Sequence, residues 1–317
     1  MSAAKFAVIG NPIAHSLSPA IHQAFAAETG IELSYEKIYA ETDQFEKIAR
    51  SFFKSGVGMN VTAPFKQDAY KFVGQRDAAS QAAHAVNTIH SQGGEFVGYN
   101  TDGVGLVRDL HRLQWPVQNA AILILGAGGA AQGIALPLLE AGASVTVTNR
   151  THARAVALRR QFPSIGLARI DQLQAGWDIV INATAAGWQQ QRLPIADHVF
   201  GNANCYDLGY QRGGKTSFVQ QVERVATAAE DGLGMLVEQA AEAFQIWHGT
   251  LPQTWPVLNG LRHPKRQFIA GAECPRCHKL DTIYVERDLL GNPLLRSCKS
   301  CSFQEDIDGN MSINLLS

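Results

Sequence analysis

Cysteine is scarce and unevenly placed in this chain of 317 residues. Residues 1–273 contain only Cys205, and the other four cysteines lie close together near the C-terminus. A secreted protein that depends on disulfides would spread its cysteines through the fold. The distribution therefore excludes that class for most of the chain and marks the C-terminal segment as a separate module. We interpret Cys205 as a small core residue rather than a nucleophile.

An excess of charge of either sign is also absent. The 27 basic and 28 acidic residues leave a formal net charge of −1. From Arg262 to the end, the basic residues exceed the acidic ones by one. This balance gives no electrostatic case for binding nucleic acid or an anionic membrane.

Long uninterrupted apolar segments are lacking too. Residues 113–139 contain no charged residue, but four glycines and Pro137 break the segment. It reads as a strand, a glycine-rich turn and a buried helix rather than a membrane span. The apolar run after Met1 is too short for a signal peptide. We therefore expect a cytoplasmic protein without a membrane segment.

Hydrophobic residues, by contrast, make up 46% of the chain, enough for a large core. Short apolar runs alternate with helical patterns, which predicts an α/β fold of mainly parallel sheets with helices on both faces. The rhythm restarts at Ala121, so we expect two α/β domains. The expected strands are residues 6–9, 33–39, 57–61, 121–125, 144–148, 179–182 and 203–207, and the expected helices are residues 19–29, 42–54 and 233–248.

A glycine-rich turn follows the strand expected at residues 121–125. It has the pattern G-x-G-x-x-A and opens a helix, so the free N–H groups of that helix can face a pyrophosphate. Glycine-rich turns are common in proteins without any role in binding, but here strand, turn, helix and second strand occur in the required order. The sequence predicts a dinucleotide site in a Rossmann domain, formed by Gly126, Ala127, Gly128, Gly129, Ala130 and Ala131.

The end of the next expected strand indicates which dinucleotide binds. An NAD enzyme would place Asp or Glu there, to hydrogen-bond the ribose 2′-hydroxyl. This chain has Asn149, Arg150 and Thr151, with Arg154 one helical turn further on. Two guanidinium groups and a hydroxyl suit a 2′-phosphate, so we predict NADP(H). The alternative is that the two arginines are ordinary solvated residues at the start of a helix.

Short polar motifs occur at the turns of the first domain. Ser16 and Ser18 precede an expected helix, with Ser18 a natural N-cap and Pro19 at the first helical position. Each motif alone is more often a turn or a cap than a ligand. Together they supply hydroxyl and amide donors, the cation Lys66 and the carboxylate of Asp102, which suits a small polyhydroxylated acid. A Lys–Asp pair beside a nicotinamide could also move a proton at a carbinol oxygen.

Residues 1 to about 262 resemble the shikimate dehydrogenase family. The resemblance implies reversible, NADPH-dependent reduction of 3-dehydroshikimate to shikimate in chorismate and aromatic amino-acid biosynthesis. It also implies two α/β domains with the active site in the cleft between them. It rests on nine motifs in family order: SLSP, NVTAPFK, AVNT, NTDG, GAGGAA, NRTHAR, INATAAG, DLGY and GLGMLVEQAA.

The same resemblance implies roles for individual residues. Lys66 and Asp102 would be the catalytic pair, and Gly232 would lie near the nicotinamide. The implied substrate-binding residues are Ser16, Ser18, Thr62, Asn87, Tyr210 and Gln239. The implied domains are residues 1–101 for substrate binding and catalysis, 102–236 for NADP binding, and 237–262 as helices that return to the first domain. We expect residues 263–317 to form a zinc-ribbon extension, which the family normally lacks.

Two questions about the reaction stay open in the sequence. A free lysine has a pKa near ~10.4, and Asp102 would stabilise the ammonium form, so we expect a charged Lys66 that stabilises an oxyanion. An acid/base role for Lys66 is the alternative.

Three positions depart from the family pattern: Gln132, Ala185 and Trp188. They leave the proposed pair intact, and residue types do not exclude quinate as a side substrate. A non-catalytic NADP sensor is a rival reading that predicts loss of Lys66 or Asp102, and both are present.

The C-terminal cysteines have the spacing C-x2-C-x20-C-x2-C. Two such pairs on tight turns supply four thiolates for tetrahedral zinc, with no coordination position left for catalysis. The predicted ligands are Cys274, Cys277, Cys298 and Cys301. A hairpin is expected between them, from residues 282–287 and 294–297. A redox dithiol pair is the alternative.

The segment that contains these cysteines resembles small bacterial zinc-ribbon proteins of unknown role, joined to the rest near His263-Pro264. Both an unknown protein partner and stabilisation of the dehydrogenase remain open as its purpose. The sequence does not specify the oligomeric state.

Overall fold

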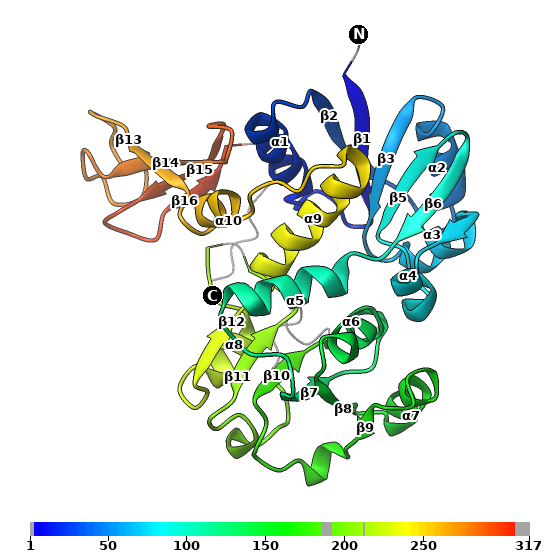
Figure 1. Cartoon of the computed structure of the whole chain (residues 1–317). Helices are drawn as coiled ribbons and strands as arrows, with labels where there is room; N and C mark the ends of the chain where they lie inside the picture. The colour runs from blue at the N-terminus through cyan, green and yellow to red at the C-terminus, as the bar shows by residue number, and fades with distance from the viewer. Residues whose placement is uncertain (1–2, 185–191, 212, 308–317) are drawn as a thin grey trace.

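The computed structural model describes residues 3–184, 192–211 and 213–307, and its two larger sheets lie on either side of a pair of helices (Figure 1). The first sheet has the strand order β2-β1-β3-β5-β6-β4. Strands β2, β1 and β3 are mutually parallel, as expected, whereas β5 and β6 form an antiparallel hairpin. The strands are β1 (Ala4–Gly10), β2 (Leu33–Tyr39), β3 (Gly56–Val61), β4 (Gln75–Arg76), β5 (Thr88–Gln92) and β6 (Glu95–Tyr99).

Buried apolar residues lie along the interior strands β1, β3 and β5 of this sheet. Ile9, Met59 and Ile89 are fully buried and pack with Phe45 and Phe65 from the helical side. Strands that are apolar on both faces need helices on both faces to cover them. The helices of this part are α1 (Ser18–Thr29), α2 (Phe45–Phe52), α3 (Lys66–Phe72) and α4 (Ala78–Ala83).

The second sheet is parallel throughout its described strands, with the order β12-β11-β10-β7-β8-β9. Its register aligns Leu125, Asn182 and Asp207 at the carboxyl ends of β7, β10 and β11. The strands are β7 (Ala121–Leu125), β8 (Ser144–Thr148), β9 (Gly166–Leu167), β10 (Ile179–Asn182), β11 (Asn204–Asp207) and β12 (Ala228–Glu230). The helices are α6 (Gly129–Glu140), α7 (His152–Gln161) and α8 (Ser217–Val222), with short 3-10 turns at Ile170–Gln172 and Asp197–Val199.

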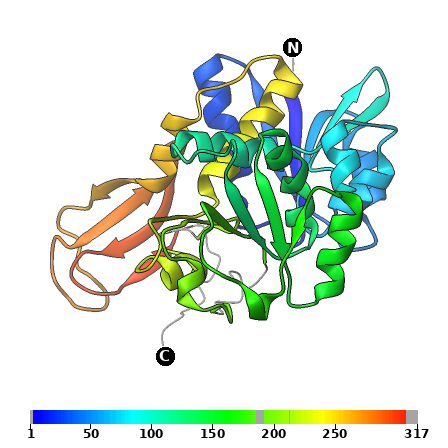
Figure 2. The ribbon, with the colours of Figure 1, turned by 60° about the horizontal axis from the view of Figure 1, so that its bottom comes forward.

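Helices α5 (Asp102–Arg112) and α9 (Leu233–His248) lie between the two sheets (Figures 1 and 2). Two glycines let α5 approach its neighbours closely. A side chain at Gly103 would collide with Pro137 of α6, and one at Gly105 would meet the backbone of α9. The sequence predicted the helix 233–248 but could not place it; its Phe244 and Trp247 pack against α1 and β1.

A buried polar network ties α5, α9 and the second sheet together. Asp109 of α5 is fully buried and accepts a hydrogen bond of 2.6 Å from the Tyr206 hydroxyl of β11. Arg112 pairs with the other carboxylate oxygen at 2.7 Å. The backbone N–H of Met235, in the first turn of α9, donates to the Tyr206 oxygen at 3.2 Å. Both carboxylate oxygens and this N–H of α9 are therefore satisfied away from water.

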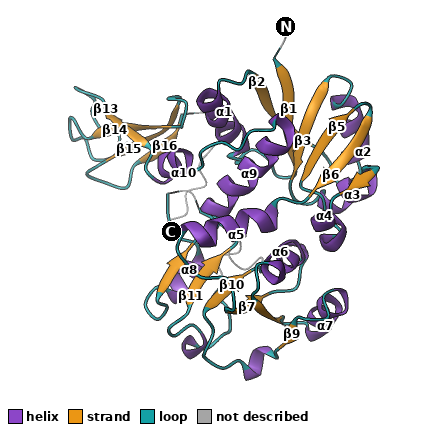
Figure 3. Cartoon of the chain, viewed as in Figure 1, coloured by secondary structure: helices purple, strands orange, loops and turns teal. Residues whose placement is uncertain are grey.

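The C-terminal segment forms a separate antiparallel sheet beside α1 and α10 (Trp255–Arg262), as Figure 3 shows. Its strands are β13 (Lys265–Phe268), β14 (Ile283–Arg287), β15 (Pro293–Cys298) and β16 (Gln304–Asp306). The expected hairpin is present as β14 and β15. The junction differs from expectation, because residues 265–268 pair with β14 instead of forming a linker. Within the described residues, no helix is long and apolar enough to cross a membrane.

Candidate functional site

Lys66 and Asp102 come together although 36 positions separate them. Lys66 begins α3 just after β3, and Asp102 begins α5 just after β6. The Lys66 Nζ lies 2.5 Å from Asp102 Oδ2, and the two side chains are 33% and 14% exposed. The pair is therefore shielded from bulk water on most sides but still accessible to a small molecule.

Asn87 holds the other oxygen of the same carboxylate. Its Nδ2 donates to Asp102 Oδ1 at 2.8 Å and to Thr101 Oγ1 at 3.0 Å. A longer contact of 3.4 Å reaches Gln239 Oε1, which also accepts from Thr101 Oγ1 at 3.3 Å. Four of the residues predicted from the sequence, Lys66, Asn87, Asp102 and Gln239, are thus brought into one hydrogen-bonded cluster.

The serine motif lies at the start of α1. Ser16 Oγ donates to Ser18 Oγ at 3.2 Å and accepts from the Ser18 N–H at 3.3 Å. The expectation that Ser18 caps the helix is wrong, because α1 begins at Ser18 itself and Leu17 occupies the cap position without a side-chain bond. Since Ser18 makes no cap, capping does not account for its hydroxyl.

A buried network missed by the sequence analysis connects the serines to Asn87. The Tyr35 hydroxyl donates to Asn60 Oδ1 at 2.6 Å, and Asn60 Nδ2 reaches the Asn87 carbonyl oxygen at 3.3 Å. Burial raises the pKa of Tyr35, and its hydrogen bond with Ser18 acts in the opposite direction. Asn60 was visible in the NVTAPFK motif, but Tyr35 lies in a strand of ordinary alternation, so no sequence signal pointed to it.

Thr62 follows β3 at the same end of the first sheet. Its backbone N–H donates to the Ile9 carbonyl oxygen at 3.0 Å, and its carbonyl oxygen accepts from Phe65 at 3.0 Å. Its methyl group occupies the space that a side chain at Gly10 would need. Thr62 is half-buried and lies four residues before Lys66, in the turn that opens α3.

The glycine-rich turn has the conformation that a pyrophosphate site needs. Gly126 has a φ of +108°, which disfavours any side chain, and donates its N–H to the Thr148 carbonyl oxygen at 2.8 Å. Gly128 and Gly129 face open space, so a ligand can approach their backbone. Ala130 is exposed on the first turn of α6, whereas Ala127 and Ala131 are buried against the sheet. These residues fit a dinucleotide phosphate at a helix N-terminus.

The residues expected at the 2′-phosphate lie at the end of β8 and the start of α7. Asn149 Oδ1 accepts from the Ala127 N–H at 3.3 Å, which joins this segment to the glycine-rich turn. Asn149 Nδ2 donates to the Thr151 carbonyl oxygen at 2.9 Å. Arg150, Thr151 and Arg154 are exposed. Their side chains are therefore accessible to a ligand held by the turn.

Helix α6 joins the glycine-rich turn to the Lys66–Asp102 pair. A Cβ atom at Gly133, in the second turn of α6, would lie 3.6 Å from Asp102 Oδ2. The Asp102 carboxylate therefore lies close to α6. No sequence motif indicated this contact.

The DLGY motif and Gly232 meet at the carboxyl edge of the second sheet. The Gly232 N–H donates to the Gly209 carbonyl oxygen at 2.9 Å, and a Cβ at Gly232 would lie within 2.8 Å of the Leu208 carbonyl carbon. Burial raises the pKa of Asp207, whose Oδ1 accepts from Asn182 at 3.0 Å. Tyr210 is half-buried and packs against the cluster formed by α1 and α9. Gln132 lies in α6, and Ala185 and Trp188 lie outside the described residues.

The four C-terminal cysteines form a compact cluster. Their sulfur atoms all lie within 4.8 Å of one another, with 3.6 Å between Cys274 and Cys301 and 3.7 Å between Cys277 and Cys298. Zn–S bonds of about 2.3 Å in a tetrahedron require S–S edges of about 3.8 Å, so the cluster fits zinc. His278 points away, with its side chain 74% exposed and paired to Glu273. Cys205 is fully buried, and burial raises its pKa to about 12, as expected for an inert core thiol.

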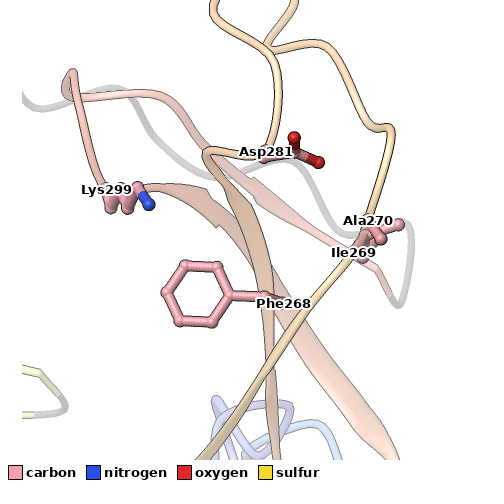
Figure 4. A pocket seen from close by; sticks show the side chains of 5 residues that line it. All are labelled: Phe268, Ile269, Ala270, Asp281 and Lys299. Carbon is pink, nitrogen blue, oxygen red and sulfur yellow. The ribbon is translucent and has the colours of Figure 1, made fainter.

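The C-terminal sheet also carries a shallow pocket of about 270 Å³ (Figure 4). It is lined by Phe268, Ile269, Ala270, Asp281 and Lys299, and Lys299 Nζ lies 5.2 Å from the centre of the Phe268 ring. Small-molecule sites are usually about 300–1,000 Å³, so this pocket is at the small end. It lies on a different sheet from Lys66 and Asp102.

Comparison with known proteins gives consistent matches. Residues 8–89 match the shikimate dehydrogenase substrate binding domain, residues 110–191 the shikimate / quinate 5-dehydrogenase family, and residues 232–254 the shikimate 5′-dehydrogenase C-terminal domain. A curated protein from Legionella pneumophila (strain Corby), named shikimate dehydrogenase (NADP(+)), is 47% identical over 261 residues, which cover 81% of this chain and 98% of the relative. One from Vesicomyosocius okutanii with the same name is 45% identical over 268 residues, covering 81% and 99%.

Solved structures match equally well. An Ael1 enzyme from Pseudomonas putida is 41% identical with a TM-score of 0.78, covering 83% of this chain and 99% of that one. Shikimate 5-dehydrogenase from Thermus thermophilus, in complex with NADP(H) and shikimate, is 32% identical with a TM-score of 0.76 and covers 82% and 98%. The two matches leave 17% and 18% of this chain uncovered.

Proposed function

Because the chain belongs to the shikimate dehydrogenase family, we propose that it catalyses the reversible, NADPH-dependent reduction of 3-dehydroshikimate to shikimate, a step of chorismate and aromatic amino-acid biosynthesis. The observation that carries this proposal is the Lys66–Asp102 pair, with its 2.5 Å contact, set against the cofactor helix at Gly133. A cation beside a nicotinamide can stabilise or protonate the carbonyl oxygen while hydride is added to its carbon, and the carboxylate can hold that cation in place.

NADP(H) is the cofactor that fits the residues present. The proposed site consists of the turn at residues 126–131, the segment from Asn149 to Arg154, and Gly232. Bound there, NADPH supplies the hydride that is added to the carbonyl carbon. The exposed guanidinium groups of Arg150 and Arg154 would take the 2′-phosphate, because no carboxylate occupies the end of β8 to repel it.

Lys66 would act on the oxygen of the reacting carbonyl. Its ammonium group is held by Asp102, whose second oxygen is fixed by Asn87, so the Nζ has one preferred position. We propose that the charged Nζ stabilises the negative charge that develops on the oxygen during hydride transfer. The alternative, in which Nζ itself delivers the proton to that oxygen, uses the same geometry.

The substrate would lie between α1, the turn after β3 and the start of α5. We propose that Ser16, Ser18 and Thr62 bind its hydroxyl and carboxylate groups, together with Asn87 and Gln239 of the cluster around Asp102. Tyr210 would close the site from the DLGY segment. Support comes from the buried polar network that joins Ser18, Tyr35, Asn60 and Asn87 in series, since its hydrogen bonds link the two groups of proposed ligands.

The C-terminal cysteines would hold one structural zinc ion. The sulfur spacing supports this assignment, and four thiolates leave the metal no open position for catalysis. We place the domain boundaries at residues 1–101, 102–236, 237–262 and 263–317. A cytoplasmic location fits thiols that bind metal rather than forming disulfides.

The decisive experiment follows NADP+ reduction with shikimate by the absorbance of the reduced nicotinamide. NAD+ and quinate are tested alongside to define the cofactor and substrate range. We expect robust turnover with shikimate and NADP+, and a loss of kcat of about 10²-fold or more in Lys66→Met. Lys71→Met, on the exposed face of the same helix, is the matched control. Near-normal turnover in Lys66→Met would exclude both proposed roles for this lysine.

A further inference from the structure

The tip of the C-terminal hairpin is a hydrogen-bonded turn that contains two leucines, of which one is half-buried and the other is exposed. Between β14 and β15, the Asp288 carboxylate accepts hydrogen bonds from the N–H groups of Leu290 at 2.9 Å and Asn292 at 2.8 Å. The Asp288 N–H donates to the Asn292 carbonyl oxygen at 2.9 Å, and Gly291 has a φ of +88°. In this fixed turn Leu289 is half-buried, whereas Leu290 is 44% exposed.

Leu289 fits against α10 because a glycine leaves room for it. A Cβ atom at Gly260 would lie only 2.6 Å from Leu289 Cδ2. Leu289 packs onto the buried cluster formed by α1, α9 and α10, which includes Val257 and Leu258. The C-terminal sheet is therefore docked on the rest of the chain through an apolar side chain in a matching space. Figures 1 and 3 show this sheet beside α10.

The same cluster supports two segments of the proposed substrate site. Leu17, between the serines of the SLSP motif, is 6% exposed and belongs to the cluster. Tyr210 of the DLGY motif packs against it. At the far end of α10, Arg262 pairs with Glu230 at 2.7 Å, two residues before Gly232. Helix α10 thus lies between the docked turn and both sides of the site.

The β14–β15 hairpin connects this contact to the cysteine cluster. Its register pairs Arg287 with Pro293 near the turn and Ile283 with Cys298 at the other end. Strands β14 and β15 are also paired on their outer edges with β13 and β16, so the hairpin is the middle of a four-stranded sheet. The turn that carries Leu289 therefore keeps its position only while the folded sheet holds it.

We propose that Leu289 is a positioning residue through which the C-terminal sheet braces α10 and the SLSP segment, and that this contact raises the affinity for the carboxylate substrate. This inference rests on the proposed function, since it assigns the substrate to the hydroxyls beside Leu17. Leu289 touches no reacting group. Its effect is to reduce the motion of the segment that carries Ser16 and Ser18, so that less ordering is needed when substrate binds.

The test compares Leu289→Asp with Leu290→Asp, which places the same charge one residue further on, on the exposed side of the same turn. For Leu289→Asp we expect a KM for shikimate about threefold to tenfold higher, with kcat and the KM for NADP+ nearly unchanged. Leu290→Asp should match the wild type, and Leu289→Met should retain most of the wild-type affinity. Equal shikimate KM values in the two aspartate variants would overturn the proposal.

A second measurement does not depend on turnover. Amide hydrogen exchange should be faster in α10 and at the start of α1 in Leu289→Asp, and unchanged in α6. Gly260→Val, which fills the space from the other side, should have the same pattern, so a folding defect peculiar to one variant does not decide the outcome. If the wild type fails to oxidise shikimate but the variants have the expected exchange pattern, the proposed function is wrong, while the structural role of Leu289 is supported. If the wild type is active and the exchange is unchanged, the brace is wrong.

Discussion

At the scale of single residues, Asn87 decides how the Lys66–Asp102 pair is oriented. Its Oδ1 accepts the Thr101 backbone N–H at 2.9 Å, so its amide nitrogen must face the Asp102 carboxylate. A backbone donor cannot rotate, and the side-chain amide is therefore locked in one orientation. Asp102 receives a neutral donor on one oxygen and the Lys66 cation on the other, which fixes the position of the cation.

Cofactor choice also depends on a few side chains. We predict that Arg150→Gln raises the KM for NADP+ by about tenfold or more, because a charge-assisted bond to phosphate contributes about 1.5–3 kcal/mol. The KM for NAD+, which has no 2′-phosphate, should change little. Steady-state kinetics with both cofactors measures this selectivity. Arg159→Gln, in the last turn of α7, is the control, and an equal effect of both variants on NADP+ would refute the assignment.

At the scale of elements, a buried polar network joins α5, α9 and β11. We predict that Tyr206→Phe lowers the free energy of unfolding by about 1–3 kcal/mol, because it leaves an oxygen of the buried Asp109 and the Met235 N–H without a partner. Thermal unfolding should shift down by a few degrees. Tyr39→Phe, which removes an exposed hydroxyl bonded to Glu41, is the control and should change little. Equal melting temperatures would contradict this account of the junction.

The sequence predicted best those elements whose physical signal is local. Leu33–Tyr39, Ala121–Leu125 and Ile179–Asn182 have the expected bounds, because turns or polar residues delimit their apolar runs. The β5–β6 hairpin was not expected, since Thr88–Gln92 is mostly polar and gains its strand structure by pairing with β3 and β6. Helix α2 is shorter than expected, at Phe45–Phe52.

In the candidate site too, the sequence predicted the residues that belong to local motifs and missed the contacts between distant elements. Motifs named Lys66, Asp102, Asn87 and Gln239, and the structure brings them together, although their roles stay predictions. Motifs could not give the packing of Gly133 against Asp102 or the link through Tyr35, because these contacts join elements far apart in the chain. Leu289 carries no motif signal either, and its contact exists only because α10 and the hairpin turn meet.

At the scale of the whole molecule, buried histidine should make stability depend on pH. His22 is fully buried, stacked on Tyr35 at 4.5 Å, and burial lowers its pKa to about 3. A histidine in the unfolded chain has a pKa of about 6.5. Below that pH the unfolded chain therefore binds a proton at His22 that the folded chain does not bind. Burial likewise lowers the pKa values of His90 and His248. Burial raises the pKa of Glu238, as it does for Asp207 and Asp231, and these carboxyls act in the opposite sense at lower pH.

We therefore predict that the free energy of unfolding falls as the pH is lowered from about 6.5 to 5, with His22 contributing up to about 1.4 kcal/mol per pH unit. Urea unfolding at several pH values measures the slope. His22→Gln, which removes the titrating ring, should flatten the slope, whereas the exposed His15→Gln should leave it unchanged. Parallel slopes in all three proteins would show that His22 does not govern the acid dependence.

Metal removal separates the stability of the C-terminal sheet from that of the two α/β domains. The sheet has a small core in which Cys274, Cys298 and Ile283 are the buried members of their cluster, so most of its folding free energy should come from zinc. With a chelator, we expect one zinc per chain to be released and four thiols to react rapidly with a thiol reagent. Cys205 should react only after global unfolding, because it is fully buried with a raised pKa.

The state of the α/β domains distinguishes this prediction from general unfolding. Their cores contain none of the four clustered cysteines, so binding of NADPH, followed by its fluorescence, should persist after chelation. Cys301→Ser should reproduce the metal-free behaviour without a chelator, and Cys205→Ser should bind metal normally. Four slow thiols in the chelated protein would mean that the sheet holds itself together. Loss of NADPH binding would mean that the C-terminal sheet and the α/β domains fold as one cooperative unit, because unfolding of the sheet would then unfold the domains.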